Sequence, residues 1–215
     1  MTREMLPSSF FQLGPLVCAQ KLIGCELRWH GCAGIIVETE AYLARNDEAC
    51  HTFMRPSARA FIERHAPGSA YVYLNYGMYW LLNVLVKGGD EDGFVLIRAL
   101  EPVRGTEMML QRRRAWARSG AAHSLYSLCS GPGKLTQSLG IDGSDHGRDL
   151  CVGHDIGFAP ISKSVEVTAD VRIGISKAAH LPWRFLLRDN PFVSVPAGRS
   201  SRDVRTKQPV KQKKT

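Results

Sequence analysis

The sequence lacks the cysteine patterns that bind structural metals. Its six cysteines include no Cys-x-x-Cys pair, and no histidine stands at zinc-finger spacing from them. Because zinc sites depend on such spacing, we expect no metal. The segment Ser130–Lys134 lacks the first glycine of a P-loop and has Leu135 where that motif needs serine or threonine. We therefore expect neither ATP binding nor another cofactor.

The chain also lacks a charged start followed by a sustained apolar run, so we expect no signal peptide. Its most apolar stretch, residues 71–86, is too short for a membrane span and is interrupted by Asn75, Gly77 and Asn83. These features predict an intracellular protein with free thiols and no membrane partner. Whether it lies in the cytoplasm (nucleoid) or the nucleus depends on the organism.

Internal repeats and a regular strand–helix alternation are missing as well. A chain of 215 residues, 44% of them hydrophobic, is typical of one globular domain. The hydrophobic pattern predicts helices over 16–23 and 134–139 and from Thr106, and strands over 34–42, 70–86 (a hairpin turning at Tyr76–Met78), 94–100 (ending at Pro102), 165–171 and 184–188. This order predicts an α+β fold: a mixed, largely antiparallel sheet with flanking helices and a protruding hairpin.

Positive charge is distributed unevenly. The formal net charge is +8, but residues 199–215 hold seven Lys or Arg against one Asp and so contribute +6. Residues 1–198 therefore carry only about +2, and we expect them to form the folded domain, followed by a disordered basic tail. Such a tail is either a solvated chain end or a salt-sensitive tether to nucleic-acid phosphates.

The strand over residues 34–42 places two carboxylates beside an aromatic ring. Strand side chains alternate, so Ile36, Glu38, Glu40 and Tyr42 fall on one face. One interpretation is the exposed face of an edge strand. The other is a general base beside a stacking surface, which is favoured by His51 only nine residues after Tyr42.

The predicted hairpin is rich in tyrosine. Tyr71, Tyr73, Tyr76 and Tyr79 fall within nine positions, whereas packing alone explains one or two tyrosines in a sheet. Tyr76 precedes the turn residue Gly77 and is expected to be exposed on a rigid mount. Such a side chain can enter a base stack and fill the gap left by an extruded nucleotide.

Two polar residues, Asn83 and Arg98, interrupt otherwise apolar strands. A buried guanidinium without a partner is unfavourable, so we expect Arg98 at a pocket edge, paired with a carboxylate. A purely structural salt bridge is the alternative. The helix start near Gly133 offers free amides, and with Lys134 it could bind a DNA phosphate; a plain helix start explains it equally well.

Several blocks of sequence, in this order, resemble one known family. They read VETEAY (37–42), DEACH (47–51), YVYLNYGMYWLLNV (71–84), VLIRALEP (95–102), CSGPGKL (129–135), RIGIS (172–176), PWRF (182–185) and NPFVS (190–194). Together they cover about residues 10–195 and resemble the alkyladenine (3-methyladenine) DNA glycosylase family. The resemblance implies a monofunctional base-excision-repair enzyme that flips alkylated or deaminated purines from duplex DNA and hydrolyses their N-glycosidic bond.

The resemblance also implies a role for each candidate residue. Glu40 is then the general base that activates water, and Arg98 helps to hold that water and the carboxylate. The flipped base would lie among Tyr42, His51, Tyr71, Tyr73 and Asn83, with Asn83 discriminating against guanine. Tyr76 would intercalate into the DNA, and damaged double-stranded DNA would be the partner of a monomeric protein.

One region departs from the family pattern. Between the histidine and the hairpin, family members carry Thr-Pro-Arg-Asn and then Met-Phe, whereas this chain reads PSARAFIERHAPG over residues 56–68. We expect residues 52–68 to form a loop that affects the lesion range. Two other functions remain open at this stage: a non-catalytic nucleic-acid-binding domain with the same fold, and a hydrolase of free nucleosides or glycans.

Overall fold

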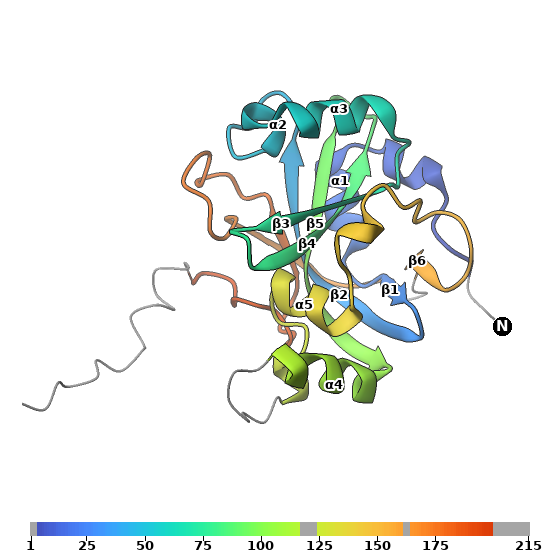
Figure 1. The fold of residues 1–215 in the computed structure, drawn as a ribbon. Coiled ribbons are helices and arrows are strands. Elements are labelled where there is room, and N and C mark those ends of the chain that lie inside the picture. The colour runs from blue at the N-terminus through green and yellow to red at the C-terminus, as the bar shows by residue number, and fades with distance from the viewer. Residues whose placement is uncertain (1–3, 117–123, 161–163, 200–215) are drawn as a thin grey trace, which may run out of the picture.

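An antiparallel sheet forms the body of the protein, which is represented here by a computed structural model (Figure 1). The structure describes residues 4–116, 124–160 and 164–199. Within them the strand order is β3 (Ala70–Asn75), β4 (Tyr79–Val86), β5 (Gly93–Arg104), β2 (Cys32–Leu43), β1 (Glu26–Trp29) and β6 (Ile156–Ala159), and β8 (Arg184–Leu187) joins β2 to β7 (Val167–Asp170). The predicted α+β fold is confirmed, although the strand pairs of these residues are all antiparallel rather than mixed.

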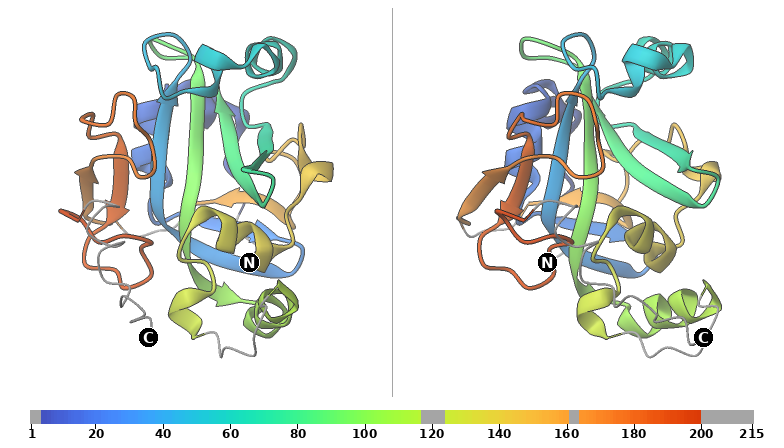
Figure 2. Two further views of the ribbon diagram at one scale, coloured as in Figure 1. Left: turned by 60° about the vertical axis from the view of Figure 1, so that its left-hand side comes forward. Right: turned by 90° about the vertical axis from the view of Figure 1, so that its left-hand side faces the viewer.

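Strand β2 is the axis of the sheet, and Figure 2 shows it beside β5 through the middle of the molecule. Its first residues pair with β1, whereas Glu38, Thr39 and Glu40 pair with β8. The register against β5 shifts on both sides of Glu38, which marks a β-bulge. A bulge changes the direction in which nearby side chains point. This one lies where the strand carries its two carboxylates.

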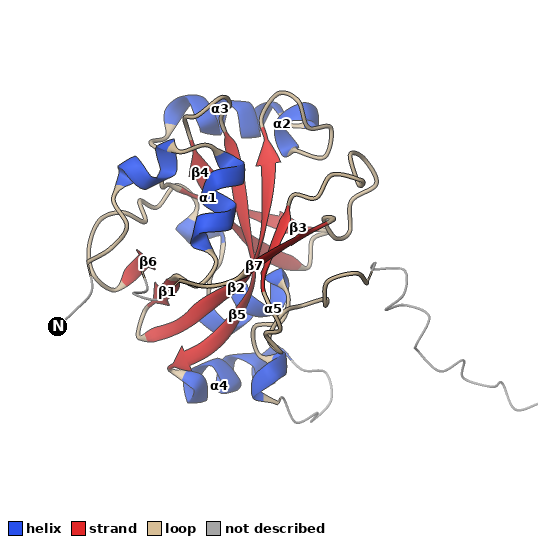
Figure 3. Ribbon diagram, turned by 180° about the vertical axis from the view of Figure 1, so that it is seen from behind, coloured by secondary structure: helices blue, strands red, loops and turns tan. Residues whose placement is uncertain are grey.

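Helices cover both faces of the central strands. Helix α1 (Pro15–Leu22) lies on one face and α5 (Pro132–Leu139) on the other, with α4 (Thr106–Trp116) beside α5 (Figures 1 and 3). Each of α1 and α5 begins with a proline after a glycine, the arrangement that favours a helix start. Three short 3-10 turns complete the described chain: Ser8–Gln12, Leu125–Ser127 and Gly143–Asp145. No helix in the described ranges is long and apolar enough to cross a membrane.

The hairpin of β3 and β4 turns tightly at its tip. Tyr76 (φ 50°) and Gly77 (φ 66°) both have positive φ, and the Met78 amide donates to the Asn75 carbonyl at 3.0 Å. These are the features of a type I′ turn, which favours Asn or Gly at the position of Tyr76. A left-handed backbone at a non-glycine residue costs about 1–2 kcal/mol. The turn therefore carries strain at Tyr76.

Two predictions were wrong. β5 continues through Pro102 to Arg104, because Pro102 lies opposite Gly34 beside a register shift, where a missing N–H is tolerated. Residues 52–68 are not a loop, since α2 (His51–Met54) and α3 (Pro56–Arg64) occupy most of that range (Figure 1). Ala58, Phe61 and Ile62 recur at helical spacing and bury one face of α3.

The predicted tail falls almost entirely outside the described residues, which end at residue 199. The boundary between domain and tail therefore stays a prediction.

A buried arginine joins the C-terminal strands to β2. The fully buried Arg184 donates to Glu38 at 3.1 Å, to Asp170 at 2.6 Å and to the Val195 carbonyl at 2.8 Å. Glu38 is buried too, so neither charge can be solvated by bulk water. Removing one partner would leave an uncompensated charge in the interior.

The substitution Arg184→Met should therefore lower the free energy of unfolding by about 3–5 kcal/mol, measured by urea denaturation. Arg188→Met is the matched control, because Arg188 and its partner Glu166 are exposed. An exposed pair contributes about 0–1 kcal/mol, so the control should unfold almost like the wild type. Equal effects of the two substitutions would contradict the role given to Arg184.

Candidate active site

A cavity of about 720 Å³ opens between the hairpin, the start of α2 and residues 173–177. Its wall combines rings and polar groups from the end of β2, α2, the hairpin, β5 and residues 173–177. All five residues predicted for the base pocket line it, together with Tyr76 and Arg98: Tyr42, His51, Tyr71, Tyr73 and Asn83. Aromatic walls with a few polar groups are typical of a binding site for a flat, partly polar molecule.

Glu40 lies directly behind this wall. Its side chain is fully buried, so the interpretation as an exposed strand face does not hold. Two donors bind the carboxylate, the Ile173 amide at 2.7 Å and the Tyr42 hydroxyl at 2.7 Å, and Arg98 forms an ion pair with it at 3.3 Å. All three residues line the cavity. The carboxylate is thus held one layer below the cavity surface.

Arg98 bridges the two carboxylates of β2. Its Nε donates to Glu38 at 2.9 Å, its Nη1 faces Glu40, and its Nη2 donates to the Ser194 hydroxyl at 3.3 Å. Burial disfavours the charged guanidinium, but the charges of Glu40 and Glu38 outweigh burial, so the pKa of Arg98 is raised. The predicted pairing with a carboxylate at a pocket edge is confirmed.

Glu38 points into the protein rather than into the cavity. It accepts hydrogen bonds from Arg98, from Arg184 and, at 2.6 Å, from the Ser194 amide. Burial alone would raise the pKa of Glu38, but the charge of Arg98 and the Ser194 hydrogen bonds lower it on balance. Glu38 is therefore an ionised partner of two arginines.

Tyr42 connects the cavity wall to Glu40. Its hydroxyl donates to Glu40, and the guanidinium carbon of Arg172 lies 4.6 Å from its ring centroid. Burial, followed by the charge and hydrogen bond of Glu40, raises the pKa of Tyr42 well above 10. The phenol thus stays protonated and keeps donating to the carboxylate.

A second part of the wall is formed by His51 and the hairpin tyrosines Tyr71 and Tyr73, which contact one another. The His51 ring meets Tyr73 edge-on at 4.2 Å between centroids, and its Nδ1 lies 3.3 Å from the Tyr71 hydroxyl. Burial, helped by the charge of Arg55, lowers the pKa of His51 from 6.5 to about 4. Across the hairpin the buried Asn83 side chain donates to the Tyr71 carbonyl at 3.1 Å. At neutral pH this wall is uncharged.

The two residues predicted to contact DNA, Tyr76 and Lys134, lie at the rim of the cavity or beyond it. Tyr76 is 83% exposed at the hairpin tip, on the cavity rim. Lys134 is exposed on α5, with its Nζ 3.4 Å from the Ser130 hydroxyl. Pro132, at the start of the same helix, lines the cavity, and Lys134 follows it two residues later in the sequence.

Sequence patterns did not identify Arg172 and Ile173, which contact Tyr42 and Glu40 from the protein interior. Arg172 pairs with Asp47, and the neighbouring Ile173 amide binds Glu40. The partners are separated by more than a hundred residues, so strand alternation gives no sign of them. Their one signal was that residues 172–176 form one of the blocks resembling the glycosylase family.

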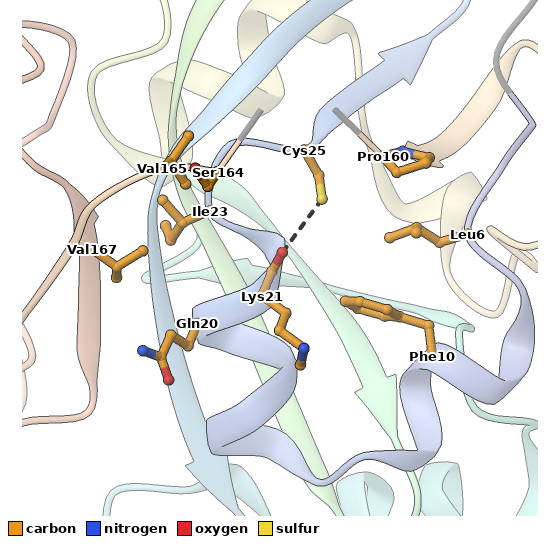
Figure 4. A pocket seen from close by; sticks show the side chains of 10 residues that line it. All are labelled: Leu6, Phe10, Gln20, Lys21, Ile23, Cys25, Pro160, Ser164, Val165 and Val167. Carbon is orange, nitrogen blue, oxygen red and sulfur yellow. Dashed lines mark hydrogen bonds between the residues drawn. The ribbon is translucent and has the colours of Figure 1, made fainter. Parts of the chain in front are cut away.

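A second hollow of about 450 Å³ lies beside α1 (Figure 4). Its lining is mainly apolar, and the hydrogen bond drawn there joins the Cys25 thiol to the Lys21 carbonyl at 3.4 Å. The described residues that line it include no carboxylate or histidine. No group of three His, Cys, Asp or Glu within the described residues could hold a metal ion.

Comparison with known proteins agrees with the resemblance. The sequence model of the family "Methylpurine-DNA glycosylase (MPG)" matches residues 9–191. Three relatives carry the name "Putative 3-methyladenine DNA glycosylase". That of Chlorobium luteolum is 40% identical over 90% of this chain and 97% of its own length. Those of Rhodopseudomonas palustris and Rubrobacter xylanophilus are 41% and 42% identical, over 89% and 84% of this chain and 89% and 92% of their own lengths.

The family match spans most of the folded part of the chain, including every candidate residue described above. The relatives are covered over nearly their full length. On this evidence the chain belongs to the methylpurine-DNA glycosylase family, whose members are hydrolases of N-glycosyl bonds.

Proposed function

We propose that this DNA glycosylase extrudes alkylated or deaminated purines from duplex DNA and hydrolyses the N-glycosidic bond with a water activated by Glu40. Candidate substrates are 3-methyladenine, 7-methylguanine, hypoxanthine and ethenoadenine. The observation that carries the proposal is the buried Glu40 carboxylate beneath an aromatic cavity. Its action on DNA locates the enzyme inside the cell.

Extrusion of the nucleotide is energetically feasible with these groups. Flipping a base costs a few kcal/mol, and less when the base is damaged or mispaired. Stacking on the rings of Tyr42 and Tyr73 could return about 1–3 kcal/mol per base. Tyr76 would fill the vacated stack from the minor groove, and Lys134 with the amides at the start of α5 would hold a phosphate. The balance then favours a weakened base over a normal one.

Hydrolysis follows from the hydrogen bonds of Glu40. A carboxylate has about four acceptor positions. The Ile173 amide donates to Oε1 and the Tyr42 hydroxyl to Oε2, while Arg98 forms an ion pair with Oε1 at 3.3 Å. The remaining position on Oε2 can accept a proton from water. The ionised group would also stabilise the positive charge that develops on the sugar.

Lysine chemistry is not part of this proposal. Lys177 lines the cavity mouth, but it is 68% exposed and pairs with Glu48 at 3.4 Å. A Schiff-base lysine is normally desolvated so that its amine can be neutral. We therefore propose hydrolysis without strand scission. A cationic alkylated purine can leave without an acid catalyst, whereas a neutral base such as hypoxanthine needs protonation.

Glu40→Gln should slow the release of 3-methyladenine from alkylated duplex DNA by roughly 10²–10⁴-fold, because the amide cannot take the proton. Single-turnover base release measures this effect, and a gel shift should show largely intact binding to lesion DNA. Glu166→Gln is the control, since Glu166 is 74% exposed on the surface. Normal turnover by Glu40→Gln would refute the base assignment, and a wild type that releases no base would refute the enzymatic function.

Tyr76→Asn should weaken DNA binding without lowering the stability of the protein. Asparagine suits the type I′ turn better than tyrosine, so the melting temperature should stay constant or rise. Loss of the inserted ring should weaken affinity for lesion DNA by about tenfold or more. Tyr126→Asn, at an exposed tyrosine 56% accessible on another turn, is the control and should bind DNA normally. Undiminished affinity of the Tyr76 variant would rule out the wedge.

The neutral state of His51 gives a pH dependence. An unfolded histidine binds a proton below about pH 6.5, whereas folded His51 does so only near pH 4. The unfolded state thus binds more protons in this window, and the free energy of unfolding should fall as pH drops from about 6.5 to 4. His51→Gln should make this fall shallower in urea titrations. Ring-proton NMR shifts of His51 that titrate near pH 6.5 would contradict the assignment.

A further inference from the structure

Arg172 forms a fully buried ion pair behind the cavity. Its Nη1 donates to one oxygen of Asp47 at 2.6 Å and its Nη2 to the other at 2.8 Å. Neither side chain is exposed to solvent. Burial disfavours the charged form, but the hydrogen bonds and charge of Asp47 outweigh it and raise the pKa of Arg172. The guanidinium is therefore charged and fixed in orientation by a two-point contact.

The flat guanidinium also contacts two rings. Its central carbon lies 4.6 Å from the centroid of Tyr42 and 5.0 Å from that of Trp183. Both distances are within the range of a cation–π interaction. Tyr42 lines the cavity, whereas neither Arg172 nor Trp183 is among the residues that line it. Arg172 therefore supports the Tyr42 wall from the side away from a bound base.

The same residue is tied to the segment that carries the carboxylate. Its Nη1 donates at 2.9 Å to the carbonyl of Ala41, the residue between Glu40 and Tyr42. The next amide along the chain, that of Ile173, donates to Glu40. A displacement of Arg172 would move the Tyr42 ring and a hydrogen-bond donor of Glu40 together.

Asp47 extends this unit toward His51. One of its oxygens accepts from the Leu43 amide at 3.3 Å and the other from the Ala49 amide at 3.1 Å. These bonds hold the turn between the end of β2 and the start of α2. The ion pair thus contacts the segments that carry the aromatic wall, the carboxylate and the histidine.

From these contacts we infer that Arg172 is a positioning residue for base excision, which fixes the Tyr42 wall relative to the Glu40 carboxylate. The inference rests on the proposed function, because it assigns a task to Arg172 only if Tyr42 stacks on a base and Glu40 acts on water. Lysine is not equivalent here. An ammonium keeps the charge but lacks the planar fork for Asp47 and the flat surface for the two rings.

The test is Arg172→Lys, assayed by single-turnover release of hypoxanthine from a duplex with enzyme in excess. Misplacement of a reacting group by about 1 Å can slow a reaction by about 10²-fold, so we expect the rate constant to fall at least about tenfold. Affinity for a duplex with a stable abasic analogue should stay within about twofold, because that ligand has no base to stack. Arg188→Met, on the exposed surface, is the control for loss of one arginine.

If Arg172 served only to stabilise the fold, the Arg172→Lys experiment would give a different result. Partial unfolding lowers the concentration of active enzyme, and with it the apparent affinity for abasic DNA, but at saturating enzyme it leaves the rate constant of the folded molecules unchanged. That pattern, or a wild-type rate constant in Arg172→Lys, overturns the inference. A wild type that releases no base from hypoxanthine-containing or alkylated duplex DNA would instead overturn the proposed function, so the two failures can be told apart.

A second variant covers the case in which Arg172→Lys does not fold. Trp183→Leu removes the ring on the outer side of the guanidinium without changing a residue that lines the cavity. We expect a reduced rate constant for hypoxanthine release with unchanged affinity for abasic DNA. A folded Trp183→Leu protein with the wild-type rate constant, together with an unfolded Arg172→Lys, would overturn the inference.

Discussion

The ion pair between Arg98 and the two carboxylates of β2 is the interaction on which the rest of the site depends. Two ionised carboxylates on one buried strand would repel each other and could not be solvated. Arg98 lies between Glu38 and Glu40, and Arg184 supplies a second cation to Glu38 from the far side. This chain of alternating charges permits Glu40 to stay buried beside the aromatic cavity.

The cavity combines opposite electrostatic environments. The wall formed by His51, Tyr71 and Tyr73 is neutral, because burial disfavours a charge on each ring. Tyr42, by contrast, donates its hydroxyl to the Glu40 carboxylate and packs its ring against the Arg172 guanidinium. Flat neutral surfaces suit a purine, whereas a fixed negative charge suits a sugar that becomes positive. The proposed excision reaction requires both at adjacent points.

Much of the fold could be predicted from local patterns. β2, the tyrosine-rich hairpin and the short helices α1 and α5 appear in the structure close to their expected bounds, and β5 begins where its apolar run predicted. The helices of residues 51–64 were missed because departure from the family pattern suggested a loop, although Ala58, Phe61 and Ile62 show helical spacing. Long-range pairs could not be predicted. Nothing in one sequence indicates that Asp47 meets Arg172, or that the amide of Ile173 reaches Glu40.

The branching of β2 has a consequence for how the protein is made. Strand β2 pairs with β1, β5 and β8, so its two carboxylates are completed by partners distant in the sequence: Arg184 lies opposite Glu40, and the Ser194 amide donates to Glu38. Contacts of such high sequence separation form late and slowly during folding. A nascent chain on the ribosome therefore cannot assemble this centre before its last strand has emerged.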